Sequence, residues 1–429
     1  MDKVTMCVQC DVAVFGGGPS GLIAAAAAAR SGAKTVLFEQ YSFLGGMATA
    51  GLVAPIGKFS KNGQAVVAGI PWELMQNVAS MGGAILGWET GNVPCDVELF
   101  KLAAQRLVLQ SGAELYLQAK LVDCQTENGH IAYAVVASCG NLLKVVAKQY
   151  VDCTADAVLC RLAGAPMQPK VAAQDAQPAS LIFRMGGVDT DALEGLEPKI
   201  PNKRYTQKEV QDRLNALREQ GEDVPNFGGP WYCTVLRDGI VNINITRCAV
   251  DANDPRSVTA AECKMREDVF KLAALLKKHY PAFRDSYVLM TGTQAGLRES
   301  DRLAGAHILT GEELINSDPF DDTVAHGAHL VDIHHAAGSG QTVQWLPKAS
   351  NIPYRSLYAK EMDNLLTAGR CISADRVAFA STRVMGTAMA TGQAAGVAAA
   401  MCAQSDCAVC ELNVQSLRQA LRDQGAIVD

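Results

Sequence analysis

Six residues near the start of the chain have the types and spacing needed to hold a diphosphate. The run Gly16-Gly17-Gly18-Pro19-Ser20-Gly21 contains the pattern Gly-x-Gly-x-x-Gly. The first glycine permits a tight turn, the second lets backbone amides approach a pyrophosphate, and the third lets a helix pack closely on a strand. Glu39 follows at the end of the next apolar run, where a carboxylate accepts hydrogen bonds from a ribose diol and disfavours a 2′-phosphate. The pattern predicts a dinucleotide whose phosphates lie at a helix N-terminus.

A charged segment later in the chain has the residues to bind an anion. In Arg298-Glu299-Ser300-Asp301-Arg302 the two arginines would be i,i+4 neighbours on one face if the segment is helical. Two neighbouring guanidinium groups suit a carboxylate, an enolate or a phosphate. The alternative is an ion network in which both arginines pair with Glu299 and Asp301.

Residues 326–335 contain four of the seven histidines of the chain. If this segment is extended, Asp332 and His334 lie on one face, and Asp332 could orient the imidazole of His334 as a proton donor or acceptor. Buried structural histidines are the alternative. A metal site from His326, His329 and His334 lacks the i,i+4 spacing of helical metal motifs, so we expect none.

The fourteen cysteines are dispersed, with two close pairs, Cys7-x-x-Cys10 and Cys407-x-x-Cys410. A zinc or iron–sulfur site joining the two pairs is one interpretation. Free thiols are the other, and we prefer them because neither pair lies in a compact metal-binding knuckle.

Local patterns predict the elements that carry these residues. A strand at 11–15, a helix at 19–30 and a strand at 35–38 form a βαβ unit with parallel strands. A helix at 97–111 precedes a strand at 114–118, and alternating residues with turns at 127–129 and 139–141 predict an antiparallel meander over 118–150. A further parallel strand is expected at 150–153.

The middle of the chain has a different pattern. An alternating run at 240–246 predicts a strand, and a helix is expected over 260–279, with a capping box of Thr259 and Glu262 at its start and Pro281 as its stop. The strand–turn–helix pattern returns at 364–368 and 386–403.

Four further segments complete a pattern that resembles one protein family. They are 44–51 (LGGMATAG), 294–299 (QAGLRE), 352–355 (IPYR) and 368–374 (AGRCISA). With the glycine turn they resemble the bacterial FAD-dependent oxidoreductase family, within the glutathione-reductase-like superfamily of flavoproteins. The resemblance covers nearly the whole chain and implies FAD as the cofactor.

The resemblance also implies an α/β fold, in which both chain ends build a Rossmann-like FAD-binding domain around an inserted α+β substrate domain. We expect the FAD-binding domain at 1–185 and 345–429 and the substrate domain at 186–344. The residues implied at the cofactor, besides the glycine turn and Glu39, are Gln40, Gly45, Gly46, Met47, the backbone around Val122 beside the adenine, Ala155, Gly369, Arg370, and Gly386, Thr387 and Ala388 at the start of a helix that points to the flavin.

Two departures from related sequences bear on function. Ala155 stands where many relatives have glycine, which affects a close backbone approach to the cofactor. There is no second Gly-x-Gly-x-x-Gly between a strand and a helix, so we expect no built-in NAD(P)H domain and a separate electron donor or acceptor.

The resulting hypothesis is hydride transfer between flavin N5 and a small organic substrate with an anionic or carbonyl group. Arg298 and Arg302 would hold that group, and His334, oriented by Asp332, would handle the proton. Tyr354, Arg355 and Arg383 are expected near the flavin edge. Dehydrogenase and C=C reductase chemistry both stay open, and the alternative is an electron-transfer flavoprotein that acts on a partner protein.

The composition of the chain bears on its possible partners and on its location in the cell. The chain has 429 residues, of which 49% are hydrophobic and 19% charged, and its net charge is -6. Scattered lysines and arginines argue against nucleic acid and anionic membranes as partners. The apolar stretches at 21–29 and 388–403 are too short or too interrupted to span a bilayer, and no signal-peptide layout is present, so we expect a cytoplasmic protein. A homo-oligomer is compatible with the sequence.

Overall fold

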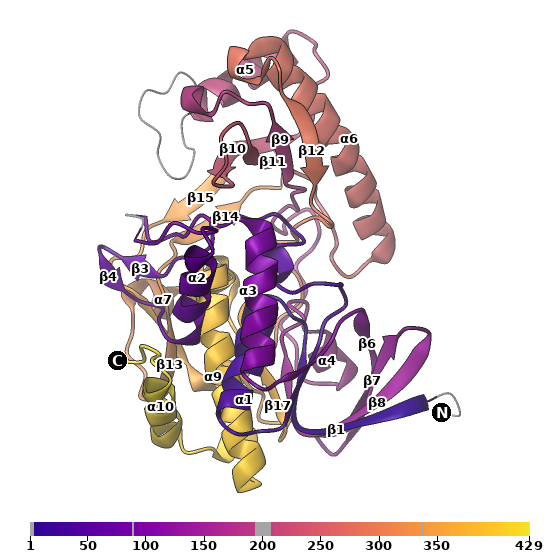
Figure 1. The fold of residues 1–429 in the computed structure, drawn as a ribbon, viewed down its shortest axis with the longest axis vertical. Helices are drawn as coiled ribbons and strands as arrows, with labels where there is room; N and C mark the ends of the chain where they lie inside the picture. The colour runs from indigo at the N-terminus through magenta and orange to yellow at the C-terminus, as the bar shows by residue number, and fades with distance from the viewer. Residues whose placement is uncertain (1–3, 88–89, 194–206, 337) are drawn as a thin grey trace.

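The computed structural model describes residues 4–87, 90–193, 207–336 and 338–429, without the side chain of Thr234. Figure 1 shows a large lower part, in which both ends of the chain lie, and a smaller upper part made of residues from the middle of the chain. The fold is mixed α/β.

The lower part is organised around a sheet with the strand order β5-β2-β1-β8-β7-β6, in which β17 also pairs with β8. Strands β1, β2, β5, β8 and β17 pair in parallel, as predicted for the βαβ unit, and β6, β7 and β8 form the predicted antiparallel meander. The strand expected at 150–153 is the last part of β8, because the meander continues directly into the parallel sheet. The strands are β1 Val4–Phe15, β2 Thr35–Phe38, β5 Glu114–Tyr116, β6 Ala119–Glu127, β7 His130–Ser138, β8 Asn141–Asp152 and β17 Leu365–Thr367.

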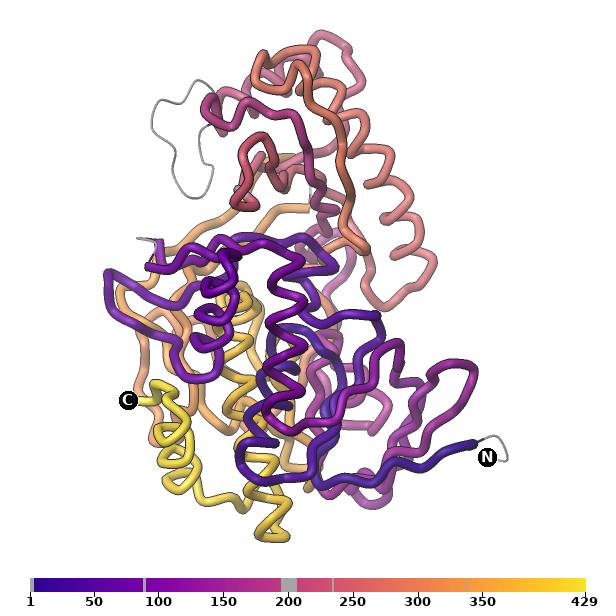
Figure 2. Tube along the Cα trace, viewed as in Figure 1, coloured from indigo at the N-terminus to yellow at the C-terminus, as the bar shows by residue number. Residues whose placement is uncertain are grey.

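Helices α1 (Pro19–Arg30) and α9 (Met385–Ser405) join the two ends of the chain. They lie side by side in both ribbon and tube (Figures 1 and 2). A Cβ atom at Gly392 would lie 2.2 Å from the carbonyl oxygen of Ser20, and one at Gly396 equally close to that of Ala24. The two glycines therefore allow the helix backbones to touch, which fixes the second chain segment against the glycine turn.

The upper part is an antiparallel sheet of order β10-β11-β9-β12, with helices α5 and α6 packed on it. Its buried apolar residues, which run from Ala179 to Ala295, form a cluster of their own. The elements are β9 Phe183–Gly186, α5 Gln207–Glu219, β10 Phe227–Thr234, β11 Val241–Thr246, α6 Pro255–His279 and β12 Tyr287–Thr291.

The predicted start of α6 is wrong. The helix begins at Pro255, and the side chain of Asp254 caps it by accepting a hydrogen bond from the amide of Arg256. Thr259 lies inside the first turns and donates to the carbonyl of Pro255. Aspartate followed by proline is the stronger start signal, because proline has no amide hydrogen to satisfy at the first helical position.

The chain between the upper sheet and β17 packs mainly on the lower part. Buried residues from Leu309 to Leu346 share one hydrophobic cluster with α1 and α9. The predicted domain limits at 186 and 344 stay a prediction. The remaining helices and strands are α2 Ile70–Ser80, α3 Val97–Gln110, α4 Val158–Leu162, α7 Gly311–Asn316, α8 Arg376–Thr382, α10 Val414–Asp423, β3 Ser60–Lys61, β4 Gln64–Ala65, β13 Thr323–Gly327, β14 Val331–His334, β15 Gln341–Gln344 and β16 Ser350–Pro353.

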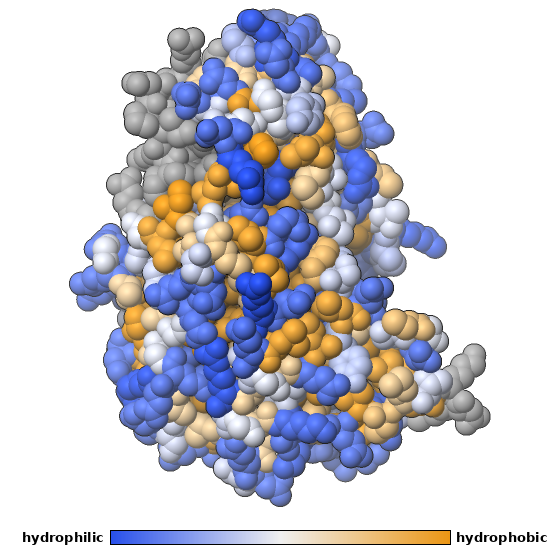
Figure 3. Space-filling model, in the orientation of Figure 1, coloured by the Kyte–Doolittle hydropathy of each residue, from blue (hydrophilic) through white to orange (hydrophobic). Residues whose placement is uncertain are grey.

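Apolar and hydrophilic side chains are interspersed over the face drawn in Figure 3. Within the described ranges, no helix is both long enough and apolar enough to cross a membrane.

Candidate functional site: a dinucleotide cavity with a buried arginine corner

A cavity of about 360 Å³ lies between the glycine turn, the ends of the parallel strands and helix α6. The walls come from both chain ends and from the upper part. The predicted cofactor residues on its walls are Gly16, Gly18, Pro19, Ser20, Glu39, Gln40, Gly46, Met47, Ala155, Arg370 and Ala388.

The glycines of the turn serve different purposes. Gly16 has φ +94°, and a Cβ atom at Gly21 would lie 1.7 Å from the carbonyl oxygen of Gly16, so packing within the protein forbids a side chain at Gly21. At Gly18 a Cβ atom would meet no protein atom closer than 3.9 Å. The protein fold does not require glycine there, whereas a diphosphate lying on the turn does.

Glu39 is held rigidly on the cavity wall and is only 4% exposed. Its Oε2 accepts a hydrogen bond of 2.6 Å from the amide of Gly17, and its Oε1 accepts one of 2.8 Å from the amide of Tyr41. Burial raises the pKa of this carboxyl group, and the two amides counteract the shift.

The second chain segment reaches the cavity through Arg370 and the start of α9. Arg370 donates to Ser300 Oγ at 2.8 Å and to Asp156 Oδ1 at 2.5 Å. Gly369 has φ +83°, and its amide donates to Thr391 Oγ1, so it shapes the turn without lining the cavity.

Two parts of the predicted cofactor contact lie elsewhere. Gly386 donates its amide to the carbonyl of Gly57, and neither it nor Thr387 lines the cavity, which α9 reaches through Met385 and Ala388. Val122 is 41% exposed on β6 and does not line the cavity, whose wall at this point is Ala119, Lys120 and Leu121. Gly21 and Gly45 do not line the cavity but contact the glycine turn. Gly21 packs against the carbonyl of Gly16, and the amide of Gly45 donates to the carbonyl of Gly17.

Ala155 lies on the cavity wall with φ +70°. An alanine therefore adopts here the left-handed conformation that glycine prefers, at a cost of about 1 kcal/mol.

The side chain of His334 is buried between the guanidinium group of Arg247 and the carboxylate of Asp332. Arg247 Nη2 lies 2.9 Å from its Nδ1, and Asp332 Oδ2 lies 2.9 Å from its Nε2. Because a guanidinium group can only donate, Nδ1 accepts and Nε2 carries the hydrogen that is donated to Asp332. Burial and the charge of Arg298 hold the pKa of His334 at about 3. The imidazole is neutral with both nitrogens engaged, which argues against the proton-transfer role suggested by the sequence.

Arg298 and Arg302 do not form the predicted pair, since residues 297–302 are not helical. Arg298 Nη1 donates to the carbonyl of Pro178 at 2.6 Å and to Ser180 Oγ at 2.9 Å. Arg302 pairs instead with Glu299 at 3.2 Å and packs over the ring of Phe379. For Arg302 the structure therefore agrees with the alternative interpretation, in which the arginines of this segment pair with its own carboxylates.

Arg383 connects this polar cluster to the cavity, because it lines the wall beside Met385. Its Nη2 donates to the backbone carbonyl of Asp332 at 3.1 Å and lies 3.7 Å from Asp332 Oδ2. Four buried atoms of this cluster have no hydrogen-bond partner among the described residues: Arg383 Nε, Gln177 Nε2, Asp332 Oδ1 and Arg247 Nε. We call Arg298, Arg383, Gln177, Asp332 and His334 the arginine corner.

The arginine corner carries an excess of positive charge. Burial, together with the neighbouring Arg383 and Arg247, lowers the pKa of Arg298 to about 9. Burial raises the pKa of Asp332, but the hydrogen bond from His334 and the charge of Arg383 outweigh it and lower the pKa to about 2. At neutral pH Arg247, Arg298 and Arg383 therefore lie near the carboxylate of Asp332, while the neighbouring Glu299 is paired with Arg302.

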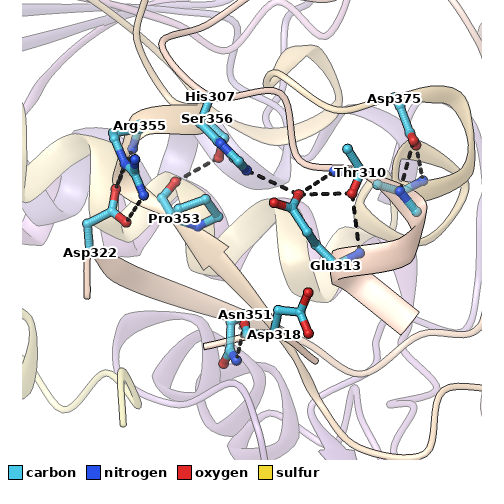
Figure 4. Close-up of polar contacts among 12 residues, drawn as sticks. His307, Thr310, Glu313, Asp318, Asp322, Asn351, Pro353, Arg355, Ser356 and Asp375 are labelled. Atoms are coloured by element: carbon cyan, nitrogen blue, oxygen red, sulfur yellow. Dashed lines mark hydrogen bonds and ion pairs between the residues drawn. The ribbon is translucent and has the colours of Figure 1, made fainter. Parts of the chain in front are cut away.

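Other residues expected at the flavin edge are structural. The hydroxyl of Tyr354 donates to the carbonyl of Val409. Arg355 points to Asp322 and donates to both of its carboxylate oxygens, at 2.9 and 3.1 Å (Figure 4).

Cys7 and Cys410 are exposed, and all fourteen cysteines are free thiols. Over the ranges that the structure describes, no group of three or more His, Cys, Asp or Glu residues is placed to hold a metal ion.

The family model described as "FAD dependent oxidoreductase" matches residues 11–421. The chain belongs to this family. FAD is its cofactor, and the wider superfamily placement stays a prediction. A search of curated proteins found no match.

Several solved structures are similar to this family member at low sequence identity. A geranylgeranyl bacteriochlorophyll reductase-like protein from Thermoplasma acidophilum is 15% identical with a TM-score of 0.49, over 98% of this chain and 83% of that one. A flavoprotein/dehydrogenase from Cytophaga hutchinsonii is 12% identical with a TM-score of 0.48, over 96% and 83%. The aromatic hydroxylase CabE from angucycline biosynthesis is 12% identical with a TM-score of 0.48, over 97% and 68%.

The cavity fits FAD. The open space at Gly18, the fixed carboxylate of Glu39 and the cationic Arg370 match a diphosphate, a ribose and an anion. Sequence reasoning missed Gln177 in the arginine corner, Arg247 next to it, and the contribution of α6 to the cavity.

Proposed function

We propose that this oxidoreductase transfers hydride between flavin N5 and a small organic substrate whose anionic or carbonyl group binds in the arginine corner. When bound, FAD supplies a two-electron hydride acceptor or donor at N5. The observation that carries the proposal is a buried cluster of guanidinium groups with unpaired donors, which reaches the wall of the cofactor cavity through Arg383.

Arg383 and Gln177 would bind the anion. Arg383 Nε and Gln177 Nε2 are buried donors without a partner among the described residues, and the two side chains already contact each other, at 3.4 Å between Arg383 Nη2 and Gln177 Oε1. An unpaired buried donor costs about 1–3 kcal/mol, which an oxyanion at this point would recover. Arg298 adds positive charge to the corner, and its guanidinium group is fixed by hydrogen bonds to the carbonyl of Pro178 and the hydroxyl of Ser180.

Asp332 would accept a hydrogen bond from a hydroxyl or amino group next to the anionic group. Its Oδ2 is used by His334, whereas its buried Oδ1 is unpaired. His334 is a positioning residue, because Arg247 and Asp332 fix its ring on both sides. The substrate class that matches both features is a carboxylic acid with an adjacent hydroxyl or amine, or the corresponding oxidised compound.

Electrons would reach or leave the flavin through a separate donor or acceptor. The proposal rests on the sequence, which contains no second glycine fingerprint of the kind that binds NAD(P)H within such chains.

The test is anaerobic flavin bleaching with a matched panel of compounds. Oxidised enzyme is mixed with 2-hydroxy and 2-amino acids and with their uncharged amides, and reduced enzyme is mixed with unsaturated carboxylates and their amides. We expect at least one carboxylate to change the flavin absorbance at least 100-fold faster than its amide, because the amide leaves the corner's charge unpaired. Equal rates for acid and amide, or a response only to electron-carrier proteins, would overturn the proposal.

A further inference from the structure

Helix α6 contributes one face to the cofactor cavity although it belongs to the upper part. The residues on the wall are Val258, Ala261, Glu262 and Met265. Their spacing of three, one and three residues places them on a single helix face. Ala261 and Met265 also belong to the hydrophobic cluster of the upper sheet, and α6 carries exposed charges elsewhere on its surface.

The contacts of Tyr41 show which end of the cavity this face of α6 lines. Tyr41 comes two residues after Glu39, and its hydroxyl donates to Gln294 Oε1. The next residue, Ala295, donates its amide to Glu262 Oε1 at 2.6 Å. Burial, followed by the negative charges of Glu39, Glu262 and Asp156, raises the pKa of Tyr41 to about 12. Glu262 therefore lies at the end of the cavity where Glu39 marks the adenosine ribose.

The second carboxylate oxygen of Glu262 lacks a hydrogen-bond donor. Oε2 is buried and accepts no hydrogen bond among the described residues, and its nearest cation, Arg266 Nη2, is 3.6 Å away. Buried carboxylate oxygens are normally satisfied, so this one indicates a donor that arrives with a ligand.

We propose that α6 closes over the adenosine half of FAD and that Glu262 Oε2 accepts a hydrogen bond from a ribose hydroxyl or from the adenine amino group. Ala261 leaves room for this approach, and Val258 and Met265 supply apolar surface. Together with Glu39, Glu262 would place two carboxylates at this end of the cavity, and these exclude a 2′-phosphate. FAD binding then joins the upper part to the lower part through α6.

The decisive experiment is a comparison of Glu262→Gln with Glu267→Gln in the full chain. Glu267 lies on the exposed side of the same helix and makes the matched control. The glutamine at 262 keeps an oxygen for the amide of Ala295, so the apo fold is retained, which thermal unfolding of the apo proteins verifies. Dissociation constants are measured for FAD, for ADP and for riboflavin by quenching or competition.

We expect Glu262→Gln to weaken both FAD and ADP about tenfold, since a charge-assisted hydrogen bond becomes a neutral one, and to leave riboflavin unchanged. Glu267→Gln should change none of the three. Unchanged FAD and ADP binding in Glu262→Gln, or a loss for riboflavin equal to that for ADP, would overturn the assignment. No substrate enters this experiment, so its failure leaves the proposed hydride transfer untouched.

Hydrogen exchange of the α6 peptide over 255–279 adds a readout of closure. FAD should protect the amides of 258–265 relative to the apo protein, and ADP should reproduce most of that protection. Equal exchange with and without FAD would show that the helix does not close over the cofactor.

Discussion

The glycine turn lines the cofactor cavity and the arginine corner reaches the same cavity through Arg383, but the two regions are built differently. At the turn, backbone groups form the binding surface. The carboxylate of Glu39 already accepts hydrogen bonds from the amides of Gly17 and Tyr41 without a ligand. In the corner, long side chains converge from distant segments, and Arg383 Nε, Gln177 Nε2 and Asp332 Oδ1 are left without partners among the described residues. The glycine turn is therefore preorganised for a cofactor that stays bound. The arginine corner keeps unpaired hydrogen-bonding atoms that a substrate could satisfy when it binds.

The sharpest test of the turn is Gly18→Ala compared with Gly21→Ala. A Cβ atom at Gly18 meets no protein atom within 3.9 Å, so the apo protein should unfold at an unchanged temperature while FAD affinity falls at least 100-fold, or about 3 kcal/mol. At Gly21 the Cβ atom would clash with the carbonyl of Gly16, so both the fold and FAD binding should fail. Calorimetry and flavin content measure the two effects. A Gly18→Ala protein that keeps its FAD would show that the diphosphate does not lie on this turn.

The corner should make stability depend on pH through His334. Its pKa is about 3 in the folded protein and about 6.5 when unfolded, so the unfolded chain binds the extra proton first and stability falls as pH drops below 6.5. Between pH 7.5 and 5 the expected loss from this residue is about 2 kcal/mol. Urea unfolding of His334→Gln should show a correspondingly smaller loss, and His335→Gln, at the exposed neighbour, should behave as the natural protein. The same acid loss in all three proteins would contradict a buried neutral imidazole.

A smaller effect is expected at Ala155, where the turn departs from related sequences. Glycine there removes the strain of φ +70°, and part of the gain is offset by the greater freedom of the unfolded chain. Ala155→Gly should therefore stabilise the protein by up to about 1 kcal/mol, whereas Ala163→Gly, at a right-handed position after α4, should destabilise it. A loss of stability in Ala155→Gly would mean that the methyl group contributes more by packing than the strain costs.

The two regions also differ in how far the sequence predicts them. The glycine turn, Glu39 and the βαβ unit depend on residues close together in the chain, and the sequence places them correctly. The corner depends on packing between segments around 177, 298, 332 and 383, which no local pattern encodes. The pairing of Arg298 with Arg302 failed because residues 297–302 are not helical.

Two predictions have local explanations. The backbone contact expected around Val122 corresponds to a cavity wall made by the preceding residues Ala119, Lys120 and Leu121. Thr259 and Glu262 match a capping box, but Asp254 followed by Pro255 is the stronger start signal, and α6 begins there. Glu262 is therefore not at the helix start, and it lines the cavity.

The arginine corner is tested most directly by anion binding to the oxidised holoenzyme. Flavin absorbance is followed during titration with simple carboxylates at constant ionic strength, in the natural protein, in Arg383→Gln and in the control Arg355→Gln, whose guanidinium pairs with Asp322. We predict a saturable spectral shift in the natural and control proteins and at least 100-fold weaker binding in Arg383→Gln, with the FAD content unchanged. Equal carboxylate affinity in all three proteins, or no saturable shift in the natural protein, would contradict an anion site beside the flavin.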